Sequence, residues 1–350
     1  MSEESVDLGF LETPEHEWRL HRCYFPSKVG GKPAWLDPKN LPTTKMLECK
    51  NCCKPMIFLL QLYAPVDEHE HCFHRSIVVF CCKNGNCYSQ QEHQTVQAFS
   101  CTLPRNNLFY PFDPPDYESG KAAQSCTNPK KLCNLCGAAG NKTCAKCKAV
   151  NYCGRDHQVL DWKNHKPVCG QETNLDDKEN DNTILFPEKE IVIESEEELG
   201  NSEELQQNDG KCNGHVSQSS SSTSYSATEL EEAVGKQSED KTFTKFKWKI
   251  ANYPDQVVRF HPGGKPLWCS AKGQIKSDDV PNCPCGAKRK FEFQIMPQLL
   301  SYLNVESTID QATIDWATVA VYACSQNCQP VTDDLCAYIP CFAWRQNFLI

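Results

Sequence analysis

A block of cysteine and histidine residues near the middle of the chain has the composition and spacing of a zinc-binding module. Between residues 130 and 170, two Cys-x2-Cys pairs are followed by a Cys-x3-His pair and a His-x3-Cys pair. Structural zinc takes four tetrahedral Cys or His ligands, so eight such side chains make two complete sites. The candidate ligands are Cys133, Cys136, Cys144, Cys147, Cys153, His157, His165 and Cys169. A block this short builds little hydrophobic core, so we expect the metal to stabilise it.

The remaining composition supports metal binding over the alternatives, which are buried free thiols and disulfides. The chain has 24 cysteines in 350 residues, and its first residues show neither the basic nor the apolar segment of a signal peptide. No run approaches the roughly 20 apolar residues of a membrane helix, so we expect no membrane association. We expect a cytoplasmic and nuclear protein, where thiols stay reduced and paired cysteines are more often metal ligands.

A six-residue phrase occurs twice in the chain, as GGKPAW at 30–35 and as GGKPLW at 263–268. Both copies continue with a close cysteine pair and a hydrophobic run, FLLQLYAP in the first and FEFQIMPQ in the second. A second run then ends in cysteines, IVVFCCKNGNC in the first copy and VAVYACSQNC in the second. This order indicates an internal duplication. The runs are rich in β-branched and aromatic residues, so we predict two similar β-rich halves.

The duplication also predicts one zinc site in each half. Aligned without a gap, Cys81 pairs with Ala323 and Cys82 pairs with Cys324, which favours Cys82 as the ligand. The first predicted set is Cys49, Cys52, Cys82 and Cys87. The second set is Cys283, Cys285, Cys324 and Cys328, in which the Cys-x-Cys pair is tighter than usual. Core thiols are the alternative for both sets. A zinc ion in each would hold two strand ends together.

The two repeated phrases each end in a tryptophan, Trp35 and Trp268. We expect each ring to fill the same place in its half, with the indole N–H bonded to the backbone; stacking on a ligand is the alternative. The histidines of DEHEHCFHR, which are His69, His71 and His74, are expected in a polar loop between strands, with a metal site as the alternative.

Charged residues are distributed unevenly along the chain. Residues 171–242 hold 19 Asp and Glu against 5 Lys and Arg, while the whole chain has a net charge of −9. This segment is Ser-rich and nearly free of aromatic residues, so we predict disorder there. Its one apolar run, EIVIESEEEL, is expected to be solvated or to order on a partner. The predicted organisation is an N-terminal β-rich half (1–125), the Cys/His block (130–170), a disordered acidic linker (171–242) and a C-terminal β-rich half (243–350).

The phrase YCGRDHQVLDWKNHKPVC, residues 152–169, resembles a MYND-type zinc finger. The resemblance implies two interleaved zinc sites. Cys133, Cys136, Cys153 and His157 would hold one ion, and Cys144, Cys147, His165 and Cys169 the other. His157 stands where most of the family has cysteine, and histidine serves zinc equally well. MYND modules usually bind proline-containing peptides, which implies such peptides or corepressors as partners. We expect no direct DNA binding, because no recognition-helix pattern is present.

The phrases PRNNLFYPFDPP, CPCGAKRKFEFQIMPQLLSYL, IDWATVAVY and FAWRQ extend the resemblance to nearly the whole chain outside the acidic linker. Together with the finger they are similar to the programmed cell death protein 2 family. The resemblance implies a mainly β fold, α+β overall, in which a duplicated two-part domain is split by the finger and the linker.

The resemblance also implies a function. The family is thought to bind a newly made small-subunit ribosomal protein, the eukaryotic counterpart of bacterial S-five, as a chaperone that supports small-subunit ribosome biogenesis. The alternative is a nuclear adaptor or corepressor scaffold that acts through the finger in transcription, proliferation or apoptosis. The chain contains no Gly-rich phosphate loop, no GxSxG and no HExxH, so we expect no enzymatic activity.

Overall fold

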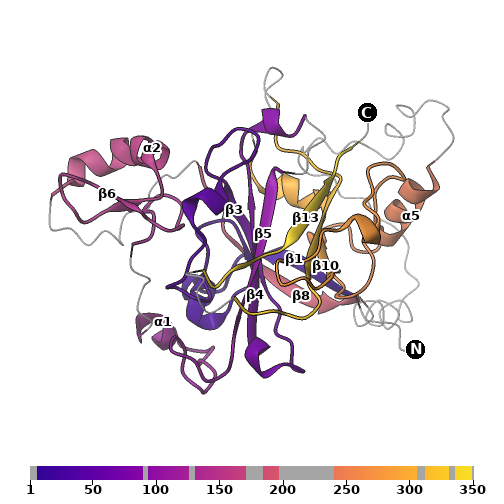
Figure 1. Cartoon of the computed structure of the whole chain (residues 1–350), viewed down its shortest axis with the longest axis horizontal. Coiled ribbons are helices and arrows are strands. Elements are labelled where there is room, and N and C mark those ends of the chain that lie inside the picture. The colour runs from indigo at the N-terminus through magenta and orange to yellow at the C-terminus, as the bar shows by residue number, and fades with distance from the viewer. Residues whose placement is uncertain are drawn as a thin grey trace, which may run out of the picture.

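The structure is a computed structural model that describes residues 6–89, 94–125, 131–170, 184–196, 240–305, 312–330 and 336–348. Eleven of its strands form one sheet in the order β12-β5-β4-β3-β2-β8-β1-β9-β10-β11-β13 (Figure 1). Their bounds are β1 (Asp7–Glu12), β2 (Lys28–Val29), β3 (Ile57–Tyr63), β4 (His74–Cys81), β5 (Val96–Leu103), β8 (Lys189–Ser195), β9 (Val258–Phe260), β10 (Arg289–Ile295), β11 (Thr318–Cys324), β12 (Ile339–Pro340) and β13 (Phe342–Gln346). The prediction of a mainly β fold is confirmed.

Short helices and a second, two-stranded sheet surround this large sheet. The α-helices are α1 (Lys121–Ser125), α2 (Arg155–His165) and α5 (Lys241–Ile250), and the small sheet pairs β6 (Lys142–Thr143) with β7 (Asn151–Tyr152). The 3-10 helices are η1 (Glu17–Leu20), η2 (Arg22–Tyr24), η3 (Thr44–Leu47), η4 (Glu70–Cys72), η5 (Gly85–Cys87), η6 (Lys166–Val168), η8 (Ser277–Asp279) and η9 (Pro297–Tyr302). In the described part of the chain, no helix has the length and apolar character needed to cross a bilayer.

The two halves repeat the same strand register. In the first half, Phe58 pairs with Phe80 and Leu60 pairs with Val79, with a bulge between them. In the second half the corresponding pairs are Phe291–Tyr322 and Phe293–Val321, with the bulge at the same place. Bulges interrupt a ladder at a defined position, so two equal bulges indicate two copies of one folding unit. The internal duplication predicted from the sequence is therefore present in the backbone.

A glutamine holds the repeated GGKP loop in each half. Gln61 of β3 accepts a hydrogen bond from the N–H of Ala34 (2.8 Å) and donates one to the carbonyl oxygen of the same residue (3.3 Å). Gln294 of β10 makes the same two bonds with Leu267, at 2.6 and 2.9 Å. A buried amide that satisfies both backbone groups of one residue fixes the loop against its strand. The two copies of the phrase therefore occupy equivalent places.

One extended segment at the C-terminal end joins the two ends of the strand order. β12 pairs with β5 of the first half, and the N–H of Cys341 donates to Ala98 at 2.9 Å. The next residues form β13, which pairs with β11 of the second half and lies beside β5 in Figure 1. The segment thus switches partners between the halves and nearly closes the sheet into a barrel. Closure protects edge strands that would otherwise expose unpaired backbone groups.

The prediction that all of residues 171–242 is disordered is wrong at residues 184–196, because the run KEIVIES forms β8 in the middle of the large sheet. β8 pairs with β1 over six residues and with β2 over two. Ion pairs hold both of its flanks, between Lys28 and Glu188 and between Arg259 and Glu196 (2.9 Å). Lys28 and Arg259 occupy equivalent positions, since they pair with Gln61 and Gln294 in the sheet.

The physical reason for this correction is that disorder was inferred from the composition of the segment as a whole. Its many charged and polar residues outnumber a short β-branched run that can complete a sheet. Asp240 caps α5 by accepting from the N–H of Thr242 (2.9 Å), so the end of the predicted linker is ordered too. The other residues of the predicted linker lie outside the described residues. Because β1 also pairs with β9, the two halves share one sheet rather than forming separate lobes.

Candidate metal centres

The structure brings the sixteen predicted ligand side chains together in four groups. Within each group the ligand atoms all lie within 4.8 Å of one another. The groups are Cys49, Cys52, Cys82 and Cys87; Cys133, Cys136, Cys153 and His157; Cys144, Cys147, His165 and Cys169; and Cys283, Cys285, Cys324 and Cys328. No further group of this kind occurs among the described residues. We call the first and last groups the N-half and C-half cysteine sets.

The separations inside the two cysteine sets match the edges of a zinc tetrahedron. Zn–S bonds of about 2.3 Å imply edges of about 3.8 Å between sulfurs, whereas a disulfide needs about 2.05 Å. In the N-half set, the Sγ atoms of Cys49 and Cys87 are 3.9 Å apart, and those of Cys52 and Cys82 are 3.6 Å apart. The corresponding separations in the C-half set are 3.5 and 3.6 Å. Both sets therefore fit a four-coordinate ion.

The finger groups fit in the same way and interleave as the MYND resemblance implies. The Sγ atoms of Cys136 and Cys153 are 3.8 Å apart, and Nδ1 of His157 lies 3.7 Å from Sγ of Cys133. In the second finger group the Cys144–Cys169 separation is 3.9 Å, and Nε2 of His165 lies 3.5 Å from the sulfur of Cys147. His157 and His165 both come from α2, on the face that is buried.

Four backbone turns of one type present the paired cysteines. In the N-half set, the N–H of Cys49 donates to Lys54 (2.9 Å), the N–H of Cys53 donates back to Cys49 (2.8 Å), and Cys53 is left-handed with φ 56°. In each of the other three pairs, the N–H of the first cysteine donates to a carbonyl oxygen four to six residues later, a later N–H donates back to that cysteine, and a left-handed residue follows. The left-handed residues there are Gly137 (φ 71°), Lys148 (φ 56°) and Gly286 (φ 89°).

The turn at Gly286 explains the tight Cys-x-Cys spacing of the C-half set. There the N–H of Cys283 donates to Ala287 and the N–H of Gly286 donates to Cys283, both at 2.8 Å, so the turn is one residue shorter. A φ of 89° disfavours side chains, and glycine removes that cost. The shorter spacing still directs both thiols to the same point.

In three of the four pairs the second cysteine is prepared for ligation, since the thiolate is the form that binds metal. Cys136 is the exception, because hydrogen bonds with Cys133 and Cys153, and then burial, raise its pKa. The backbone N–H of Ala287 lowers the pKa of Cys285 to about 7, with help from the neighbouring thiols. Burial raises the pKa of Cys147, but the N–H of Ala149 and further hydrogen bonds outweigh it and lower the pKa to about 6. Burial and a backbone bond oppose each other in the same way at Cys52, whose pKa is also lowered.

Cys81 is adjacent to the ligand Cys82, and the alignment of the two halves argued against Cys81 as a ligand. In the structure it lies in the core. It is buried, and burial raises the pKa of its thiol to about 12. Cys81 belongs to none of the four ligand groups, whereas its neighbour Cys82 does.

The finger docks on the first GGKP loop through Trp35. The Trp35 indole N–H donates to the carbonyl oxygen of Gly137 at 2.7 Å, and the ring is 1% exposed. A Cβ at Gly137 would approach Cβ of Lys32 to 2.8 Å, so the contact requires glycine. Sequence reasoning missed this contact, because nothing in either segment signals a partner about 100 residues away. Trp35 fulfils the prediction of a buried ring whose N–H is bonded to backbone.

The same prediction is wrong for Trp268, which is only partly buried. It packs beside Val280 and Phe291, while helix α5 covers the second GGKP loop with Phe246 next to Leu267. The physical reason is that the duplicated loops carry different neighbours. The finger covers one and an amphipathic helix covers the other, at opposite sides of the sheet in Figure 1.

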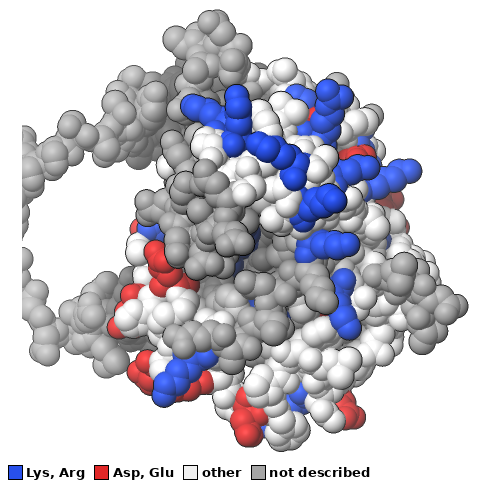
Figure 2. Space-filling view, turned by 90° about the vertical axis from the view of Figure 1, so that its left-hand side faces the viewer, with Lys and Arg blue, Asp and Glu red and all other residues white. Residues whose placement is uncertain are grey.

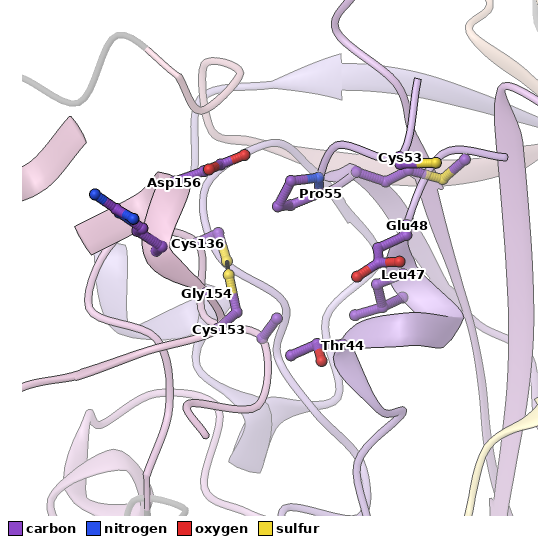
Figure 3. Close-up of a pocket in the computed structure, with 12 residues that line it drawn as sticks. Thr44, Leu47, Glu48, Cys53, Pro55, Cys136, Cys153, Gly154 and Asp156 are labelled. Atoms are coloured by element: carbon purple, nitrogen blue, oxygen red, sulfur yellow. Dashed lines mark hydrogen bonds between the residues drawn. The ribbon is translucent and has the colours of Figure 1, made fainter. Parts of the chain in front are cut away.

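A cavity of about 210 Å³ lies between the finger and the N-half cysteine set (Figure 3). Leu47 and Glu48 line it from the β-rich half, and Cys136, Cys153 and Asp156 line it from the finger. In Figure 3 the two groups face each other across the open space.

The histidines of DEHEHCFHR do not assemble into a metal group among the described residues. His69 and His71 lie in or next to η4, and Nε2 of His71 is 2.9 Å from the carbonyl oxygen of Asn327. His74 is not in the predicted loop, because it is the first residue of β4. It is buried, stacks on Phe25 and bonds to the Tyr63 hydroxyl at 2.9 Å.

Three family profiles match the chain. They are the N-terminal domain of programmed cell death protein 2 (residues 5–117), the MYND finger (133–169) and the C-terminal domain of programmed cell death protein 2 (240–347). Programmed cell death protein 2 of Bos taurus is 39% identical over 349 residues, which cover 98% of this chain and 96% of that protein. The chain belongs to the programmed cell death protein 2 family. The MYND finger indicates a zinc protein.

Two further proteins are similar to this chain, one over nearly its whole length and one over about a quarter of it. The Rattus norvegicus protein of that name is 39% identical over 354 residues, with 98% of this chain and 96% of that protein covered. A Schizosaccharomyces pombe protein named probable 20S rRNA accumulation protein 4 is 38% identical over 102 residues, covering 26% of this chain and 24% of that protein. No solved structure matches.

Proposed function

We propose that this chain is a zinc-stabilised chaperone for a newly made small-subunit ribosomal protein, the eukaryotic counterpart of bacterial S-five, and that it supports small-subunit biogenesis. The observation that carries this proposal is the relationship to a Schizosaccharomyces pombe protein whose name refers to rRNA accumulation. It connects the family to ribosome production, and the proposal includes action of this chain in the cytoplasm and nucleus. The resemblance of nearly the whole chain to the programmed cell death protein 2 family implies the same function.

The metal has a structural role in this proposal. Four zinc ions would be held, two by the finger and one by each cysteine set. Each group offers four ligands, so each ion is saturated and no coordination position is open for a substrate. The N-half set joins the turn before β3 to the end of β4, and the C-half set does the same for β10 and β11. Closed sites that fix strand ends suit a rigid binding surface rather than a catalyst.

The experiment is capture of proteins bound during synthesis. The tagged full-length chain would be isolated with its translating ribosomes, and the bound proteins and messages identified by mass spectrometry and sequencing. We expect enrichment of the S-five counterpart over other ribosomal proteins of similar size and charge. Equal recovery of all basic ribosomal proteins would contradict a dedicated chaperone.

A second candidate function, a peptide-binding adaptor, is favoured by one observation on the finger. Val159, Leu160 and Trp162 of α2 are 63%, 56% and 40% exposed, so an apolar surface is open there. Val159 is the most exposed of the three, whereas the Trp162 ring lies 6.0 Å from the ring of the ligand His165, so Val159→Ser should spare zinc and folding. Loss of corepressor or proline-peptide binding in this variant, with retention of the ribosomal client, would assign the two partners to different surfaces.

A further inference from the structure

A loop of the first half presents apolar side chains to solvent. In residues 104–118, Leu108 is 91% exposed, Phe112 is 59% exposed and Tyr117 is 51% exposed. Phe73, which immediately precedes β4, is 39% exposed. Four large apolar side chains from one region are more than isolated surface residues, and such patches mark interaction sites. We call Phe73, Leu108, Phe112 and Tyr117 the loop patch.

The loop is held in this shape by its own hydrogen bonds. The Asn107 side chain accepts from the N–H groups of Phe109 (2.8 Å) and Tyr110 (3.0 Å) and donates to Pro104 (3.0 Å). Tyr110 is buried beneath the loop, and its hydroxyl donates to the carbonyl oxygen of Leu36 at 2.7 Å. A loop fixed in advance loses little conformational freedom when a partner binds, so its exposed side chains are available for contact.

Arg105 connects two members of the patch, Phe73 and Phe112. Its guanidinium lies 4.0 Å from the ring centre of Phe112 and 5.2 Å from that of Phe73, and its Nε donates to the carbonyl oxygen of Phe112 at 3.1 Å. Both rings therefore lie against one guanidinium group. Phe73 and the loop therefore form a continuous surface rather than two separate ones.

Exposed carboxylates lie in the same two segments as this surface. Six exposed acidic residues lie in 65–73 and 104–118, against Arg105 as the single Lys or Arg: Asp67, Glu68, Glu70, Asp113, Asp116 and Glu118. The finger has the opposite character, because all seven of its described Lys and Arg residues are exposed and Asp156 is its one exposed carboxylate. Figure 2, which faces the finger side of the molecule, shows basic side chains gathered above and acidic ones mostly below.

We propose that the loop patch and its carboxylates are the docking face for the client, and that the bound element is an extended basic segment with apolar side chains. This inference rests on the proposed function. A ribosomal protein is basic, and its apolar side chains are uncovered before it folds. Complementary charge attracts such a segment to the patch and speeds its encounter, while the basic finger repels it. Binding of RNA or of an acidic peptide has no support at this acidic surface.

The test uses the full-length chain co-expressed with the S-five counterpart, with client recovery and affinity measured for matched variants. Leu108→Ser with Phe112→Ser removes apolar contacts from exposed positions, so the fold should persist. We expect affinity to fall by about tenfold or more, as for truncated interface anchors. The control is Trp248→Ser, which removes an 82% exposed ring from α5 on another side of the molecule and should leave affinity unchanged.

A second pair of variants tests the charges. Asp113→Lys with Glu118→Lys should weaken binding and flatten its dependence on salt, while Asp278→Lys with Asp279→Lys on η8 should do neither. If wild-type chain retains the client and both patch variants bind within twofold of it, the docking face is wrong and the chaperone proposal stands. If wild-type chain does not bind the client, both proposals fall. Dimerisation of the wild-type chain alone that is lost in the patch variants would overturn the inference by assigning the surface to self-association.

Discussion

Arg75 of the first half and Glu292 of the second form an ion pair from which solvent is excluded, with each side chain 2% exposed. Arg75 lies on β4, and Glu292 lies at the bulge of β10. The duplication places Ala317 and Leu59 at the corresponding positions, and both are buried. Arg75 and Glu292 therefore form an ionic contact between the halves, whereas the equivalent residues Ala317 and Leu59 are apolar. The two copies have diverged in the residues at the interface between them.

Breaking this pair should destabilise the protein strongly. Arg75→Met leaves the Glu292 carboxylate buried without its partner, and we expect a loss of about 3–5 kcal/mol in the free energy of unfolding. Arg75→Met combined with Glu292→Leu removes both charges and should recover much of that loss. Chemical denaturation of the single and double variants measures the difference, and equal destabilisation by both would refute the reasoning.

Metal content should report the four proposed sites separately. Mass spectrometry of the native chain or elemental analysis should give four zinc ions, and Cys285→Ser should lower the value to three, because a site with three ligands releases its ion more readily. Cys81→Ser is the control, since Cys81 lies outside the four groups, and should keep four ions. A value of two in the unaltered chain would restrict zinc to the finger.

The contact between Trp35 and Gly137 should decide whether the finger stays docked. Trp35→Phe removes the indole donor and leaves the buried carbonyl oxygen of Gly137 unpaired, at a cost of about 1–3 kcal/mol. Hydrogen exchange in residues 133–140 should become faster. Trp268→Phe is the matched control, because its ring is only partly buried and does not touch the finger, and it should leave this exchange unchanged.

His74 should make stability depend on pH. Burial is the main cause, and the charge of Arg105 the second, that lowers the pKa of His74 to about 4. In an unfolded chain the pKa of histidine is about 6.5. Between these values the native state binds fewer protons than the unfolded state, so stability rises with pH. The contribution is complete above about pH 6.5 and is lost as pH falls through 4.

The test compares wild type with His74→Gln. The difference in unfolding free energy between the two proteins should shrink across that pH range. Zinc release in acid affects both proteins and cancels in the comparison. A constant difference would show that His74 does not titrate there.

The sequence by itself predicted the groups of candidate ligands, because the turn that presents each cysteine pair closes within a few residues. The bonds from Cys49 to Lys54 and from Cys283 to Ala287 are local, so spacing carries the information. The duplication was also readable, and the alignment of FLLQLYAP with FEFQIMPQ already paired Gln61 with Gln294, although their role as clamps was not foreseen. Metal occupancy of the four groups is still a prediction.

Only the tertiary structure decided how the repeated units are joined. The strand β8 between β2 and β1, the bond from Trp35 to Gly137 and the pair of Arg75 with Glu292 connect residues about 100 to 217 positions apart. No local pattern encodes such contacts, since they depend on which surfaces the two halves leave uncovered when they close on each other. The same reason explains why Trp35 is buried and Trp268 is only partly buried, although both end the same repeated phrase. The duplication copied the local backbone geometry, but the distant segments that pack on each copy are different.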